Sequence, residues 1–262
     1  MNHLLGIEEG ETFELHEELK NALIDTVRAI HPEHEQVKSQ LIRIADFMTR
    51  FDTVLSLNYD LLVYWAMLEG RAKHGNWLKD CFIQEGRFDN DYAPLREPYN
   101  AEGATLVFYP HGSLILATTL FGEEVKLSRV GDERLLDRIL KTWQEEDCTP
   151  LFVSEGETRK KLQAIRRSPY LKAVYDCEVA TITDSLVIYG WSFGDQDEHI
   201  LQGIIRKGIG RMAISVHTAS GRSQHFCGET ETKIRDMEET LRKNEECEIV
   251  FFDSESDGVW NR

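Results

Sequence analysis

The sequence lacks closely spaced cysteine pairs and long apolar runs. Its five cysteines lie at positions 81, 148, 177, 227 and 247, so no two are closer than 20 residues and no Cys-x-x-Cys zinc motif exists. We expect no metal site, and reduced thiols in a cytoplasmic protein, because a chain of 262 residues can bury a core without disulfides. No apolar stretch approaches the roughly 18 residues of a transmembrane helix, and the acidic N-terminus does not resemble a signal peptide. The sequence therefore predicts no contact with membranes.

Basic residues are also scarce. Thirty lysines and arginines stand against 46 aspartates and glutamates, which gives a formal net charge of −16. A surface this acidic repels phosphate groups, so general binding of nucleic acid is disfavoured. Three familiar catalytic motifs are missing as well: the Walker phosphate loop, the Gly-x-Ser-x-Gly elbow and His-Glu-x-x-His.

What is present is an alternation of helical and strand-like hydrophobic patterns. The predicted strands are 51–57, 105–109, 184–189, 211–217 and 248–253. The predicted helices are 14–30, 36–50, 59–68, 133–146, 159–167, 169–181, 196–206 and 229–245. Residues 70–104, rich in Gly, Asn, Asp and Pro, are predicted to form a loop. Strands separated by helices indicate an α/β fold with a mainly parallel sheet.

Polar residues follow three of the predicted strands, where parallel sheets bind their ligands. They are Asn58 and Asp60 after 51–57, His111, Gly112 and Ser113 after 105–109, and Gly190, Ser192 and Asp197 after 184–189. An adjacent amide and carboxylate can act on one ligand together. In the third segment the glycine allows close backbone approach, and the N–H groups that begin the next helix can bind a phosphate.

Each of these segments also has a purely structural interpretation. Asn58 and Asp60 are preferred helix N-caps, and His111 lies between a proline and a glycine, as an ordinary turn residue would. The polar residues 192–197 could cap the helix that follows them. His199 on that helix is interpreted as a packing or hydrogen-bonding residue. The functional interpretation depends on all three segments meeting at one sheet.

In this order, the three segments resemble motifs of the sirtuin fold family: Asn58-Tyr59-Asp60, His111-Gly112-Ser113 and Gly190-Trp191-Ser192. Longer segments resemble an uncharacterised bacterial family of sirtuin-like proteins. They are FDTVLSLNYDLLVYWAM (51–67), REPYN (96–100), PLFVSEG (150–156), SPYL (168–171) and SLVIYGWSFGDQDEHIL (185–201). The similarity runs from about Leu19 to Asp253, nearly the whole chain.

The resemblance implies a Rossmann-like sheet with helices on both faces, and NAD as substrate or ligand. His111 would be the general base, Asn58 would place the nicotinamide ribose and a water, and Asp60 would orient the site. The residues expected to contact the cofactor are Gly112, Ser113, Gly190, Ser192 and Asp197. We expect one domain, with a helical N-terminal region (1–50) and a Rossmann-like core (51–253).

Two departures from the sirtuin pattern shape the functional prediction. Deacylating sirtuins carry a zinc module with two cysteine pairs, which this sequence lacks. That favours hydrolysis of NAD, as in sirtuin-like antiphage proteins, over deacylation. Sirtuin-like domains also open with a strand and a Gly-rich phosphate loop, whereas residues 3–10 have no second close glycine and no serine. We therefore expect the first βα unit to be missing, in a shortened chain or one whose sheet is completed by another copy or a partner.

Two functions remain open at this point. The first is an NAD glycohydrolase of bacterial defence type, which uses His111, Asn58 and Asp60. The second is a non-catalytic nucleotide-binding or scaffold module that has lost the phosphate loop.

Overall fold

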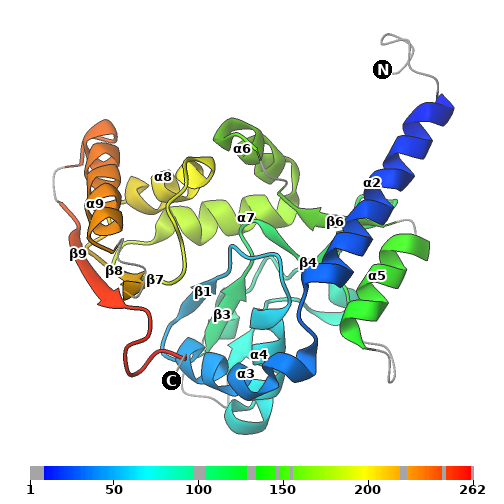
Figure 1. Ribbon diagram of the computed structural model, residues 1–262, viewed down its shortest axis with the longest axis horizontal. Helices are drawn as coiled ribbons and strands as arrows, with labels where there is room; N and C mark the ends of the chain where they lie inside the picture. Colours follow the sequence, from blue (N-terminus) through cyan, green and yellow to red (C-terminus); the bar gives the residue numbers. More distant parts are fainter. Residues whose placement is uncertain are drawn as a thin grey trace.

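The computed structural model describes residues 9–96, 104–128, 134–145, 148–153, 156–218, 223–243 and 246–260, with side chains from residue 18 onward. It has a mixed α/β fold (Figure 1). The helices are α2 (Glu9–Ile30), α3 (His34–Met48), α4 (Leu62–His74), α5 (Leu135–Glu145), α6 (Thr158–Arg167), α7 (Pro169–Cys177), α8 (Glu198–Arg206) and α9 (Ser223–Thr240). The predicted helical segments are thereby confirmed, with shifted ends. None of these helices has the length and apolar character that a membrane span needs.

Local sequence signals explain several helix ends. The Glu33 N–H donates to the Gln36 side chain at 2.9 Å at the start of α3, as in a capping box. At the start of α7, the Ser168 hydroxyl accepts from the Leu171 N–H at 3.0 Å, and Pro169 occupies the first helical position.

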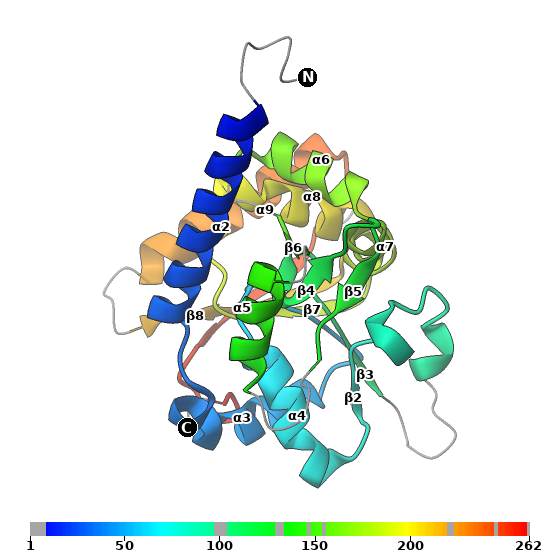
Figure 2. The ribbon, with the colours of Figure 1, turned by 90° about the vertical axis from the view of Figure 1, so that its right-hand side faces the viewer.

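The helices α2 and α5 lie side by side, which Figure 2 shows from the end of the molecule.

The described strands form three sheets of three strands each. Two are parallel, with the strand orders β1-β3-β2 and β7-β8-β9, and the third, β5-β4-β6, is antiparallel. The strands are β1 (Thr53–Leu55), β2 (Leu78–Lys79), β3 (Thr105–Phe108), β4 (Gly112–Thr118), β5 (Glu124–Lys126), β6 (Thr149–Phe152), β7 (Ser185–Ile188), β8 (Arg211–Val216) and β9 (Glu248–Asp253). Both β1 and β7 are edge strands within these sheets.

This arrangement confirms the α/β class and corrects two details of the prediction. Residues 70–104 are not simply loop, because α4 continues to His74 and β2 pairs with β3. The chain also turns back after Tyr109 into the antiparallel strand β4, so that parallel and antiparallel sheets coexist. Hydrophobic runs mark strands but do not reveal the direction in which a strand pairs.

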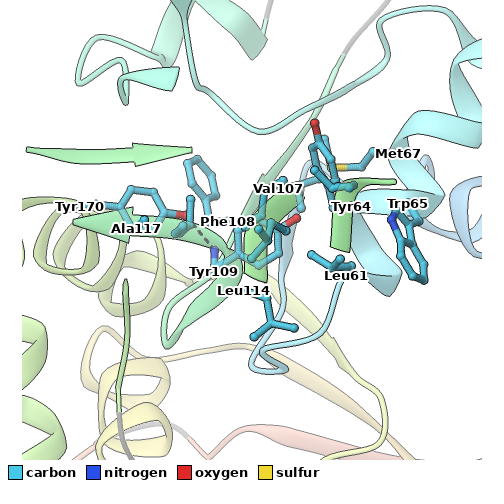
Figure 3. Close-up of a cluster of buried hydrophobic side chains, with 14 of the residues drawn as sticks. Leu61, Tyr64, Trp65, Met67, Val107, Phe108, Tyr109, Leu114, Ala117 and Tyr170 are labelled. Carbon is cyan, nitrogen blue, oxygen red and sulfur yellow. Dashed lines mark hydrogen bonds between the residues drawn. The ribbon is translucent and has the colours of Figure 1, made fainter. Parts of the chain in front are cut away.

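Two hydrophobic clusters stabilise the fold. The larger lies around β3, β4, α4 and α5, and the smaller lies between α8 and the sheet β7-β8-β9. Leu55 of β1 and Tyr175 of α7 pack against both clusters and so connect them. In the larger cluster the buried Tyr170 hydroxyl accepts from the Tyr109 N–H at 3.0 Å (Figure 3). This bond fixes the end of β3, where the candidate site begins.

Candidate functional site

His111 lies in the tight turn between β3 and β4. The Gly112 N–H donates to the Tyr109 carbonyl at 2.9 Å, and the His111 carbonyl accepts from the Val153 N–H at 2.8 Å. Gly112 has φ = 82°, and a Cβ at this position would lie 2.1 Å from the Leu151 carbonyl oxygen. Only glycine fits such a position. The turn therefore holds His111 rigidly, with only 3% of the residue exposed.

His199, in the first turn of α8, is the direct partner of His111. The two Nε2 atoms are 2.9 Å apart, which is a hydrogen-bond distance. His199 is fully buried, and its carbonyl accepts from the Tyr175 hydroxyl at 2.8 Å, which ties α8 to α7. The end of β3 and the helix that follows β7 thus meet through two imidazoles.

A buried ion pair adjoins the two histidines. Lys161 of α6 is 2% exposed, and its ammonium group donates to Oδ1 of Asp197 at 2.9 Å. The same oxygen lies 4.0 Å from Nε2 of His111. We call His111, Lys161, Asp197 and His199 the histidine cluster. Buried charged groups are costly to maintain, so a cluster of four titratable side chains is a candidate functional site.

Burial keeps both histidines neutral. It is the main cause that lowers the pKa of His111 and His199 below the ordinary value of 6.5. The charge of Lys161 lowers the pKa of both further, and the carboxylate of Asp197 acts in the opposite direction. At neutral pH each ring therefore has one N–H and one lone pair, and His111 is able to accept a proton.

The segment after β1 lies directly against the His111 turn. The Tyr59 carbonyl accepts from the Leu114 N–H at 2.8 Å and from the Ser113 hydroxyl at 3.2 Å. The structure thus brings together the Asn58–Asp60 and His111–Ser113 segments. Ser113 is fully buried within β4 and uses its hydroxyl for this contact.

Asn58 and Asp60 differ in their surroundings. The Asn58 residue is exposed. Oδ1 of Asp60 accepts from the Leu62 N–H at 2.9 Å just before α4, whereas the N-cap position itself is occupied by Leu61, so neither Asn58 nor Asp60 is the N-cap residue of this helix. Burial raises the pKa of Asp60. Among the hydrogen bonds of the described residues, neither side chain bonds to His111.

The turn after β7 carries the other expected cofactor contacts. Gly190 has φ = 71°, and its N–H donates to the Ser215 hydroxyl at 3.0 Å. Gly190 and Ser192 are both exposed. Between them, Trp191 stacks on Phe193 with ring centroids 4.2 Å apart. Asp197, also expected at the cofactor, instead has its carboxylate within the histidine cluster, where it pairs with Lys161.

The histidine cluster also offers donor atoms for a metal ion. One atom from each of His111, Asp197 and His199 lies within 4.8 Å of the other two. Two imidazoles and a carboxylate are common ligands of Zn²⁺. In this structure the Asp197 carboxylate forms an ion pair with the Lys161 ammonium group.

Sequence analysis missed the part that Lys161 plays and assigned His199 only to packing or hydrogen bonding. One signal for Lys161 is visible in hindsight. It lies one helical turn before the buried Ile165, on the face of α6 that points into the protein. A lysine at such a position requires a buried anion as its partner.

A family model described as a domain of unknown function (DUF4917) matches residues 1–260. The chain belongs to this family. The match covers the strand-end segments and the histidine cluster. No curated protein matches the sequence.

Proposed function

We propose that this DUF4917 protein binds NAD and hydrolyses it to nicotinamide and ADP-ribose, in the cytoplasm and in a bacterial defence setting. One observation carries the proposal. Two of the three strand-end segments that resemble sirtuin motifs meet at His111, since Tyr59 bonds to residues 113 and 114, and His199 of the helix after the third segment bonds to His111 itself. Convergence of strand ends is typical of ligand sites in parallel α/β folds.

The residues present suit the chemistry of NAD hydrolysis. The bond between nicotinamide and ribose breaks, its electron pair leaves with nicotinamide, and the ribose acquires oxocarbenium character. A water molecule then forms the new C–O bond and loses a proton. The neutral His111 can take that proton, directly or through a ribose hydroxyl. The exposed Asn58 is available to orient the ribose and the water.

The rest of the nucleotide would lie along the turn after β7. There the exposed Gly190 has no side chain, and the exposed Ser192 offers a hydroxyl. With a net charge of −16, the protein must hold a pyrophosphate by local N–H and hydroxyl groups rather than by its overall field.

A non-catalytic nucleotide-binding module is the second candidate. The observation in its favour is the burial of His111, which is 3% exposed and already bonded to His199. An enzyme of this design has to expose His111 when substrate binds, whereas a scaffold does not.

Calorimetry and product analysis on the whole chain distinguish the two. NAD and ADP-ribose are titrated into the protein, and nicotinamide is then quantified after incubation with NAD. Binding of both ligands with release of nicotinamide supports the hydrolase. Binding without release supports the module, and the absence of both binding and release refutes the proposal.

A further inference from the structure

We infer that His199 is a positioning residue that accepts the Nε2 proton of His111 and leaves Nδ1 of His111 as the nitrogen with the free lone pair. The identity of the substrate that would use this lone pair rests on the proposed function. The hydrogen bond and the tautomer do not, because they belong to the protein alone.

The geometry is that of two rings meeting edge to edge. The Nε2 atoms are 2.9 Å apart, whereas the ring centroids are 5.1 Å apart and the planes are inclined by only 27°. Each Nε2 therefore points at the other, and the rings do not lie face to face. Two neutral imidazoles in this arrangement need one N–H and one lone pair between them, so they adopt opposite tautomers.

The surrounding groups decide which histidine donates. The carboxylate of Asp197 raises the pKa of both histidines, but its Oδ1 lies 4.0 Å from Nε2 of His111, and so near an anion a proton at that nitrogen is favoured. The proton of His199 is then on Nδ1, which is buried and makes no well-formed hydrogen bond. An interaction with the Gln196 backbone raises the pKa of His199.

This arrangement prepares His111 for one proton transfer. When Nδ1 takes a proton from a water or ribose hydroxyl, the electron pair of the broken O–H bond stays on oxygen and His111 becomes an imidazolium. Its Nε2–H remains bonded to His199, and the carboxylate of Asp197 stabilises the new charge. Lys161 opposes that charge, and its ion pair with Asp197 fixes the carboxylate in place.

Coordination of a metal would require a different geometry. Two nitrogens bound to a tetrahedral Zn²⁺ at about 2.1 Å lie about 3.4 Å apart, with lone pairs that converge on the ion. Here the nitrogens are 2.9 Å apart and face each other, and the carboxylate is bonded to Lys161. The hydrogen bond between the two histidines and the ion pair between Lys161 and Asp197 together give all four side chains a partner without a metal ion. Metal binding is therefore an alternative outcome of the test below.

Nitrogen NMR on protein with ¹⁵N-labelled histidine tests the inference without any substrate. At pH 7 we expect His111 to be protonated on Nε2 and His199 on Nδ1. The His199→Leu and His111→Gln variants assign the signals, and His225→Leu, at a side chain 75% exposed on α9, is the matched control. His111 protonated on Nδ1, or both histidines charged, would overturn the inference. So would a stoichiometric metal ion whose removal by EDTA shifts both Nε2 signals.

Nicotinamide release then shows whether the tautomer matters to turnover. In His199→Gln the amide oxygen can still accept from His111, whereas leucine in the same volume cannot. We expect His199→Leu to lower kcat about 100-fold with little change in KM, and His199→Gln to recover most of that loss. Equal kcat values in the two variants would show that His199 contributes only to packing and does not position His111. If the wild-type protein releases no nicotinamide, the proposed function fails, while the NMR result still decides the tautomer.

Discussion

Acid should destabilise this protein through its two buried histidines. Their pKa values are lowered by burial in the folded state, whereas in the unfolded chain they titrate near 6.5. As the pH falls through 6.5, the unfolded chain takes up protons that the folded protein does not. The free energy of unfolding must therefore decrease as the pH falls. It is unaffected by these two histidines only above pH 6.5, where they are neutral in both the folded and the unfolded chain.

The size of the effect follows from linkage. A histidine that protonates near its ordinary pKa when unfolded and stays neutral when folded loses about 2 kcal/mol of stability between pH 7 and pH 5. His111 and His199 together therefore contribute a loss of about 4 kcal/mol, a large part of the roughly 5–15 kcal/mol that stabilises a typical domain. The His199→Gln variant keeps only one of the two groups, so its loss should be about 2 kcal/mol smaller.

The assay is urea unfolding of the wild-type protein and His199→Gln at several pH values between 7 and 5. Carboxylates that titrate in this range are shared by both proteins and cancel in the comparison. We expect the two stability curves to converge as the pH falls. Parallel curves would refute the statement that both histidines stay neutral in the folded protein.

Three further substitutions have clear expected results. Gly112→Ala should destabilise the protein by more than about 2 kcal/mol in chemical denaturation, because the backbone conformation and the close Leu151 carbonyl both exclude a Cβ. Lys161→Met should lower the free energy of unfolding by about 3 kcal/mol by leaving the Asp197 carboxylate unpaired, and adding Asp197→Asn should restore part of that loss; additive losses would contradict this. Asp60→Ala should cost about 1 kcal/mol through the lost hydrogen bond to the Leu62 N–H at the start of α4, whereas Asp60→Asn should be nearly neutral in thermal unfolding; a large loss in Asp60→Asn would show that the charge itself matters.

Much of the fold could be predicted from local patterns. Amphipathic spacing located α2 and α8, and apolar runs located β3 and β7, because each of these elements buries one face or lies wholly inside the protein. The two-residue strand β2 left no such pattern, since Leu78 and Lys79 are too few to show a period. Its place in the sheet comes from pairing with β3, which is a tertiary contact.

The candidate site was predictable only in part. His111 stood out because it follows a strand and precedes a glycine that a tight turn requires. Its hydrogen bond to His199 joins residues 88 positions apart. The ion pair of Lys161 and Asp197 joins residues 36 positions apart. Contacts of this kind depend on how α6 and α8 pack, and a single sequence does not specify that packing.

The assignment of His111 to NAD hydrolysis is tested most directly by comparing nicotinamide and ADP-ribose production from NAD by the wild-type protein and by His111→Gln. Circular dichroism and urea unfolding on the same samples establish that the variant is folded. We predict equimolar release of the two products by the wild type and a loss of about 100-fold or more in the variant. Release that is unchanged in folded His111→Gln, or no release by the wild type, would contradict the assignment of this site to NAD hydrolysis.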